Sequence, residues 1–87
     1  MNKHTVKEAG KNGTVEVYAD RIIRTMKRTF GKDDVQTIPI RAVTAVTLNR
    51  RTFGASEVTV TVGAMHYVWK SSTAEALANQ INAGVLT

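Results

Sequence analysis

Apolar and polar residues alternate with a period of two along much of the chain, which is the pattern of half-buried β-strands. The stretch EVTVTV at 57–62 is the most regular, and its valines are predicted inward and its threonines outward. MHYVWKS at 65–71 follows after a Gly-Ala turn and places Met65, Tyr67 and Trp69 on one face. TVEVY at 14–18 has the same period, so several antiparallel strands are expected.

The middle of the chain, VQTIPIRAVTAVTLN at 35–49, is rich in β-branched residues, which favours strand over helix. Pro39 cannot donate to a strand ladder and therefore marks an edge position or a break. We predict one short strand before Pro39 and a longer strand from about Val43 to Arg50. RRTFGAS at 50–56 is predicted to be a hairpin loop.

The period changes in the last segment, SSTAEALANQINAG at 71–84. Apolar residues now recur at helical spacing; they are Ala74, Leu77, Ala78, Ile81 and Val85. Ser72 and Glu75 are spaced as a capping box, and Gly84 is placed as a C-cap. The sequence therefore predicts one amphipathic α-helix at the end of the chain.

The stretch DRIIRTMKRTF at 20–30 fits two structures. On a helical wheel its apolar residues share one face and its basic residues cover the other, which is typical of a helix on a membrane or on nucleic acid. As an extended chain it is a short strand that runs into a basic loop. Residue propensity slightly favours the helix.

Residues 1–12 are polar and lie just before Gly13, so they are interpreted as a flexible N-terminal arm, and residues 13–87 as a single domain. A domain of this size buries about 60% of its unfolded surface, so self-association would add useful burial. The lack of cysteine excludes disulfides and thiolate metal sites. Since no apolar run reaches the roughly 18 residues of a membrane span and no secretory signal is evident, we expect a cytoplasmic location.

The net charge of +5 is concentrated in the first third of the chain. Residues 1–32 carry eight Lys and Arg against three acidic residues, whereas residues 33–87 carry four of each sign. This asymmetry is consistent with an ordinary soluble surface, and it also favours an acidic or phosphate-rich partner. Candidate contact residues around 21–32 and 50–51 are Arg21, Arg24, Lys27, Arg28, Lys32, Arg50 and Arg51.

Two loop segments share an unusual pattern, KRTFGK at 27–32 and RRTFGA at 50–55. Each places a phenylalanine, Phe30 or Phe53, between basic residues and a glycine. Together the two loops would form a shared binding end for a single-stranded nucleic acid, through base stacking and phosphate contacts. The favoured interpretation is that each phenylalanine packs under its own turn.

Catalytic chemistry has little support in the sequence. His4 and His66 lie far apart along a chain without cysteine and make a poor metal set. Adjacent Asp33 and Asp34 fit a turn, where Asp commonly bonds its own backbone. We therefore expect no enzyme activity, no cofactor, no metal and no small-molecule substrate.

The stretches GTVEVYADRIIRT, VQTIPIRAVTAVTL, EVTVTVGAMHYVWKS and TAEALANQIN, at about residues 13–84, resemble the bacterial pleckstrin-homology-like (PH-like) domain family. The resemblance implies an α+β, mainly β fold: a partly open antiparallel β-barrel or sandwich of about 6–7 strands, capped by one C-terminal amphipathic helix. It also implies that Ile22–Lys27 is a strand paired with TVEVY across the Ala19–Asp20 turn, with Arg24 presented on one face.

The same resemblance implies a non-enzymatic binding module, because PH-like folds dock peptides along a sheet edge or beside the terminal helix. We expect protein–protein interaction or self-assembly in a bacterial or phage context. A phage accessory protein would fit a free-standing domain of this size. The alternative is an anionic-surface binder that contacts nucleic acid or acidic phospholipid through the basic loops.

Overall fold

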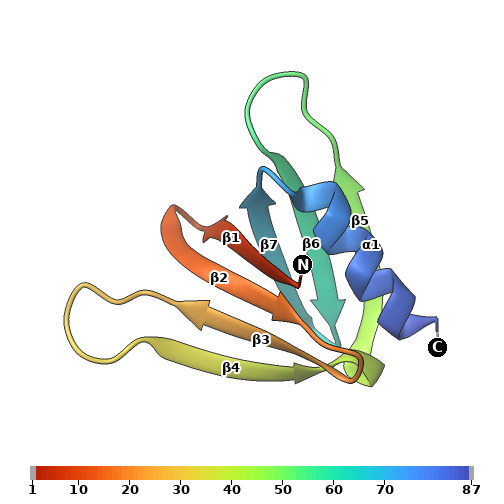
Figure 1. Cartoon of the computed structure of the whole chain (residues 1–87), viewed down its shortest axis with the longest axis horizontal. Coiled ribbons are helices and arrows are strands. Elements are labelled where there is room, and N and C mark those ends of the chain that lie inside the picture. The colour runs from red at the N-terminus through yellow and green to blue at the C-terminus, as the bar shows by residue number, and fades with distance from the viewer. Residues whose placement is uncertain (1, 87) are drawn as a thin grey trace.

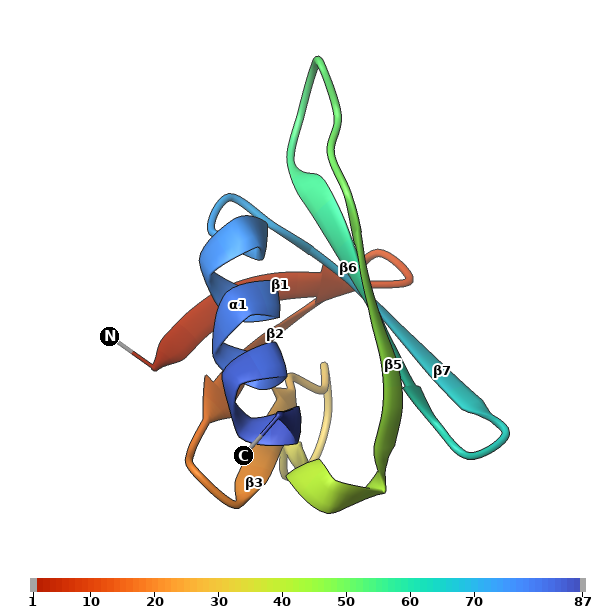
Figure 2. The same ribbon diagram turned by 90° about the vertical axis from the view of Figure 1, so that its right-hand side faces the viewer.

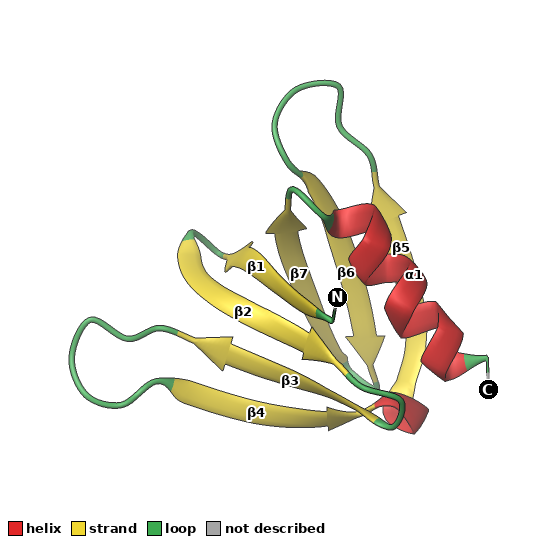
Figure 3. Cartoon of the chain, viewed as in Figure 1, coloured by secondary structure: helices red, strands yellow, loops and turns green. Residues whose placement is uncertain are grey.

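The computed structural model describes residues 2–86 and consists of an antiparallel sheet and a C-terminal helix (Figures 1 and 3). The strands are β1 (Lys3–Glu8), β2 (Lys11–Val17), β3 (Arg21–Met26), β4 (Asp34–Pro39), β5 (Val43–Asn49), β6 (Ser56–Val62) and β7 (Met65–Ser71). A short 3-10 helix, η1 (Ile40–Ala42), joins β4 to β5, and α1 (Ala74–Val85) follows β7.

The sheet has the strand order β4-β3-β2-β1-β7-β6-β5, so β4 and β5 are its two edges. It curls into two halves, β1–β4 and β5–β7, without closing, and α1 lies in the angle between them (Figure 2). This confirms the predicted fold class: α+β, mainly β, with an incompletely closed antiparallel sheet and one C-terminal helix. It also confirms the edge position predicted for Pro39, the last residue of β4.

The stretch at 20–30, which fits either a helix or a strand by sequence, contains strand β3. This confirms the extended alternative for residues 21–26. It pairs with β2 across a turn, with Val17 opposite Ile22. Ile22 and Met26 are buried on the inner face, whereas Phe30 lies beyond the strand and is exposed. The apparent helical stripe therefore combines residues that lie on different faces of an extended chain.

The interpretation of residues 1–12 as a flexible arm is wrong, and so is a domain start at residue 13. Lys3–Glu8 is the central strand β1, and β2 begins at Lys11. Two inward positions of β1 are polar, His4 and Glu8, and each finds hydrogen-bond partners far along the chain. Residues 1 and 87, the outer limits of the two predicted ranges, lie outside the described residues.

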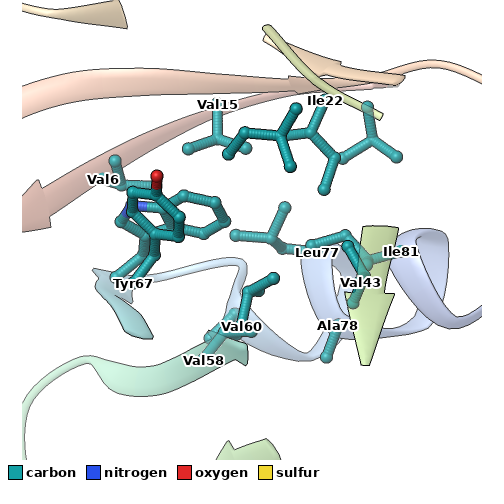
Figure 4. Close-up of a cluster of buried hydrophobic side chains, with 14 of the residues drawn as sticks. Val6, Val15, Ile22, Val43, Val58, Val60, Tyr67, Leu77, Ala78 and Ile81 are labelled. Atoms are coloured by element: carbon teal, nitrogen blue, oxygen red, sulfur yellow. The ribbon is translucent and has the colours of Figure 1, made fainter. Parts of the chain in front are cut away.

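The helix α1 fills the curl of the sheet, as predicted from its spacing (Figure 4). Leu77 and Ile81 are fully buried and contact the inner faces of both halves. The inward alternation of β6 is confirmed at Val58 and Val60. The predicted inward face of β7 holds for Tyr67 and Trp69, but Met65, at the hairpin end, is exposed because no element covers it.

Both predicted caps of α1 are wrong. The N-cap is Thr73 and makes no side-chain cap hydrogen bond. Glu75 contacts Arg50 instead of completing a capping box with Ser72. Gly84 lies inside α1, where a Cβ would come within 2.6 Å of Ile40 Cδ1, so its small size serves packing of the helix on η1.

Candidate binding surfaces

A polar network lines the inner face of the sheet at the end away from α1. The Arg24 guanidinium makes two hydrogen bonds to the Glu8 carboxylate, one of them from Nε to Oε1 at 2.7 Å. The Trp69 indole N–H donates to the same Oε1 at 2.8 Å. The Gln36 amide donates to the Tyr67 hydroxyl at 2.8 Å, and the Arg24 guanidinium lies 5.4 Å from the Tyr67 ring centroid. The network therefore connects β1, β3, β4 and β7.

Arg24 is committed to this network and is not a free surface cation. Its side chain is 16% exposed and that of Glu8 is 21% exposed. The hydrogen bonds from Arg24 lower the pKa of Glu8 below its ordinary value, although burial acts in the opposite direction. The same contact raises the pKa of Arg24. Arg24 does lie on one face of β3, but its guanidinium is paired with Glu8 and is not a free cation for a partner.

The remaining basic residues of 21–32 divide between the two ends of β3. Arg21 lies at the β2–β3 turn, where it contacts Asp20 at 2.9 Å and lies 4.8 Å from the Tyr18 ring centroid. Lys27, Arg28 and Lys32 belong to the β3–β4 loop at the other end. The sequence prediction of one local basic cluster therefore holds only for the β3–β4 loop.

The β3–β4 loop is exposed and strongly basic. Arg28 lies 3.5 Å from the Asp34 carboxylate. Within residues 2–86, Lys27 and Lys32 make no ion pair. Phe30 is 87% exposed, so the favoured interpretation that it packs under its own turn is wrong. An aromatic ring with two free ammonium groups nearby on the same loop is a suitable contact for an anionic surface.

In the β5–β6 loop, by contrast, both arginines are paired with acidic residues. Arg50 lies 3.1 Å from Glu75, and Arg51 forms an ion pair with Glu57. Phe53 is 89% exposed, which again contradicts packing under its turn. The β3–β4 and β5–β6 loops project from different corners of the molecule (Figures 1 and 2), so the predicted shared binding end is not formed.

Two open clefts flank the β1–β2 turn, where Ala9 and Gly10 both have positive φ. The first, here called the loop cleft, has a volume of about 820 Å³, and its lining includes the basic residues Lys11, Lys27 and Arg28. The carboxylates of Glu8 and Asp34 also line it, paired with Arg24 and Arg28. The second, here called the β7 cleft, has a volume of about 750 Å³ and lies between the turn and β7. The lysines of β1 and β2 are not among the predicted contact residues, because residues 1–12 were expected to form a flexible arm.

The outer edge of β4 is a further exposed surface. β4 is the last strand on its side of the sheet, and Val35 and Thr37 are exposed on it. The N–H of Ile40 donates to the Asp20 carbonyl at 3.0 Å, on the β3 side. Because main-chain groups alternate sides along a strand, those of Val35 and Thr37 point away from β3. They are therefore open to another strand.

Groups with catalytic or metal-binding chemistry are dispersed. His4 is buried, and its ring nitrogens lie 2.7 Å from Thr73 Oγ1 and 2.8 Å from Gln80 Oε1. His66 Nδ1 lies 3.1 Å from Thr61 Oγ1 on the outer face. Residues 2–86 contain no group of three or more His, Cys, Asp or Glu that could hold a metal ion.

No helix within residues 2–86 is long and apolar enough to cross a membrane. No protein-family model and no curated protein matches the chain.

Proposed function

We propose that this chain is a non-enzymatic binding module of PH-like type, which recognises a protein strand by adding it to the outer edge of β4. The partner strand comes from another protein or from a second copy of the chain. The observation that carries this proposal is the free, uncharged edge of β4 at Val35 and Thr37. The motifs at residues 13–84 and the order of seven strands followed by a helix support the PH-like assignment.

Natural sheet edges are usually protected by charge or by proline. On β4 such protection is confined to the ends of the strand, where Asp34 faces Arg28 and Pro39 lacks an N–H group. The centre of the strand offers N–H and C=O groups beside β-branched side chains. Edge addition relies on main-chain hydrogen bonds and needs no signature residues, which fits a chain without catalytic motifs.

Self-pairing at this edge has a natural register. A two-fold axis through Gln36 places Val35 opposite Thr37 of the second copy, with the outward main-chain groups of both residues paired. Asp34 then lies opposite Ile38 of the second copy, so no like charges face one another. Self-assembly is thus compatible with the same surface that would bind another protein. The lack of cysteine suits a reducing cytoplasm, and a bacterial or phage setting is part of the proposal.

The variant Thr37→Pro should abolish binding at this edge. Proline removes the outward N–H without breaking a hydrogen bond to β3, so the fold should remain intact. Light scattering coupled to gel filtration should show self-association that weakens in the variant, or affinity capture from the native host should recover a partner that the variant loses. The control Thr37→Val keeps the N–H and should behave as the original protein. A strictly monomeric chain whose partners bind Thr37→Pro equally well contradicts the proposal.

Anionic-surface binding is the second candidate function, favoured by the lysines of the loop cleft and by exposed Phe30. Binding to single-stranded DNA or to vesicles of anionic lipid should fall steeply with added salt. The double variant Lys11→Glu/Lys27→Glu should abolish it. The control Lys3→Glu/Arg41→Glu makes the same change in net charge outside the loop cleft and should retain most of the binding to DNA or vesicles. Little binding at low ionic strength removes this candidate.

A further inference from the structure

β7 is an interior strand at one end and a free edge at the other. It pairs with β6 along its whole length, from Met65 to Ser71. With β1 it shares a single residue pair, Lys7 opposite Lys70. Beyond that pair the two strands diverge, and the β6–β7 hairpin extends away from the β1–β2 turn (Figure 2). The sheet therefore has a notch beside the first half of β7.

The free main-chain groups in this notch follow from the hairpin geometry. Val62 and Met65 pair across a two-residue turn, so the main-chain groups of Met65 face β6. Alternation then directs the N–H and C=O groups of His66 and Val68 toward the notch. Lys70 is the next residue on that side, and it is the one that pairs with β1. Two residues of β7 thus carry main-chain groups with no strand of residues 2–86 beside them.

The β7 cleft occupies this notch and has an apolar floor. Its volume of about 750 Å³ lies within the usual range for ligand sites, roughly 300–1,000 Å³. Met65, which is 57% exposed, lies on the inner face of β7 with Tyr67, whereas Val68, which is 40% exposed, lies on the outer face with Lys70. Tyr67 completes the inner wall. An extended chain in the cleft would cover this apolar surface and pair with the free main-chain groups.

The charge of the β7 cleft is positive. Glu8 is its acidic residue, and Arg24 neutralises it through two hydrogen bonds. Lys7 and Lys70 lie at the rim on the outer face. Lys7 makes no ion pair within residues 2–86, and Lys70 has only a distant contact of 3.9 Å with Glu57, which already pairs with Arg51. The rim therefore complements acidic side chains.

We propose that the free edge of β7 at Met65–Val68 is a docking site for an extended segment of a partner protein in which apolar and acidic residues alternate. The added strand would lie between β7 and the β1–β2 turn. Its apolar side chains would point inward onto Met65 and Tyr67, and its acidic side chains outward beside Lys7 and Lys70. This site is separate from the β4 edge and does not depend on whether that edge binds anything.

The test selects binders from a random-peptide display library with the intact chain as bait. The enriched peptides should alternate apolar and acidic residues, and each should bind the original chain at least about tenfold more tightly than Val68→Pro and Lys7→Glu. Val68→Pro removes an N–H that faces the notch, and Lys7→Glu reverses a rim charge. If circular dichroism shows that Val68→Pro is unfolded, Met65→Glu takes its place, because that side chain is exposed.

Two controls separate this site from the other surfaces. Thr37→Pro changes only the β4 edge, and Lys27→Glu makes the same charge change as Lys7→Glu but in the loop cleft; both should bind the peptides as the original chain does. The proposal is overturned by a selection that enriches no peptide, by peptides without acidic residues, or by binding that survives Val68→Pro and Lys7→Glu. Binding lost only in Thr37→Pro would assign the peptides to β4 and overturn it as well.

Discussion

Replacing Trp69 with Ala should lower the free energy of unfolding by about 3–5 kcal/mol. The side chain is fully buried and stacks on Tyr67, with ring centroids 5.8 Å apart. Its loss leaves a large cavity and removes the hydrogen-bond donor to Glu8. Since a small domain has only about 5–15 kcal/mol of stability, the variant should be marginally folded. Urea denaturation followed by far-ultraviolet circular dichroism measures the change.

The variant Trp69→Phe separates packing from the hydrogen bond. It retains an aromatic ring in the core but cannot donate to Glu8, so its loss of stability should be clearly smaller than that of Trp69→Ala. Equal losses in the two variants would show that the hydrogen bond to Glu8 outweighs packing. A loss below about 1 kcal/mol in Trp69→Ala would contradict the burial of this residue in the core.

The ion pair between Arg24 and Glu8 should make stability depend on acid pH. Because Arg24 lowers the pKa of Glu8 in the folded protein below the ordinary value of 4.5, the unfolded chain takes up the proton first as the pH falls. The stabilisation is therefore complete above about pH 4.5 and is lost as the pH falls through the lower pKa of folded Glu8. Thermal unfolding across this range should show a steady fall in stability.

Arg24→Met should remove the stability that the ion pair with Glu8 contributes, together with the dependence of folding stability on acid pH that this pair causes. At neutral pH we expect a loss of about 1–3 kcal/mol, less than for a fully buried pair because both side chains retain some exposure. Arg21→Met is the matched control: its pair with Asp20 is largely exposed, so it should change stability by no more than about 0.5 kcal/mol. An unchanged acid profile in Arg24→Met would show that Glu8 is not the responsible group.

Much of the fold is predictable because its buried strands alternate cleanly. Val58 and Val60 are separated by threonines, and the helical spacing of Leu77 and Ile81 leaves no competing period. A regular pattern of this kind depends only on neighbours within a few positions. The order of the strands after β1 and of the final helix was therefore visible in the sequence, and the position of Pro39 on an edge followed from its missing N–H.

Strand β1 was not predictable, for a physical reason. Two of its inward residues, His4 and Glu8, are polar, and a polar residue on an inward position looks like loop in a local pattern. Their partners lie in β3, in β7, and in α1 and its N-cap, so the compensation for their burial is entirely non-local. The same applies to the candidate surfaces. Arg24 seemed a free cation because nothing near it in sequence marks Glu8 as its partner.

The notch beside β7 was equally invisible in the sequence. Its existence depends on the point at which β1 and β7 diverge, which the single pair of Lys7 with Lys70 defines. MHYVWKS alternates as an ordinary hairpin strand, and its free side appears only in the assembled sheet. The exposure of Phe30 and Phe53 was also hard to predict, because a Phe-Gly pair fits both a packed turn and an exposed loop tip.

The position of β1 at the centre of the sheet has a consequence for how the chain is made. On the ribosome, residues 3–8 emerge before the other strands, yet two of their neighbours, β7 and α1, are synthesised only from residue 65 onward. Until then β1 can pair only with β2, and its buried histidine has no acceptor for its ring. Such long-range closure slows folding, so the nascent chain should stay sensitive to proteases until nearly all of these residues have left the exit tunnel.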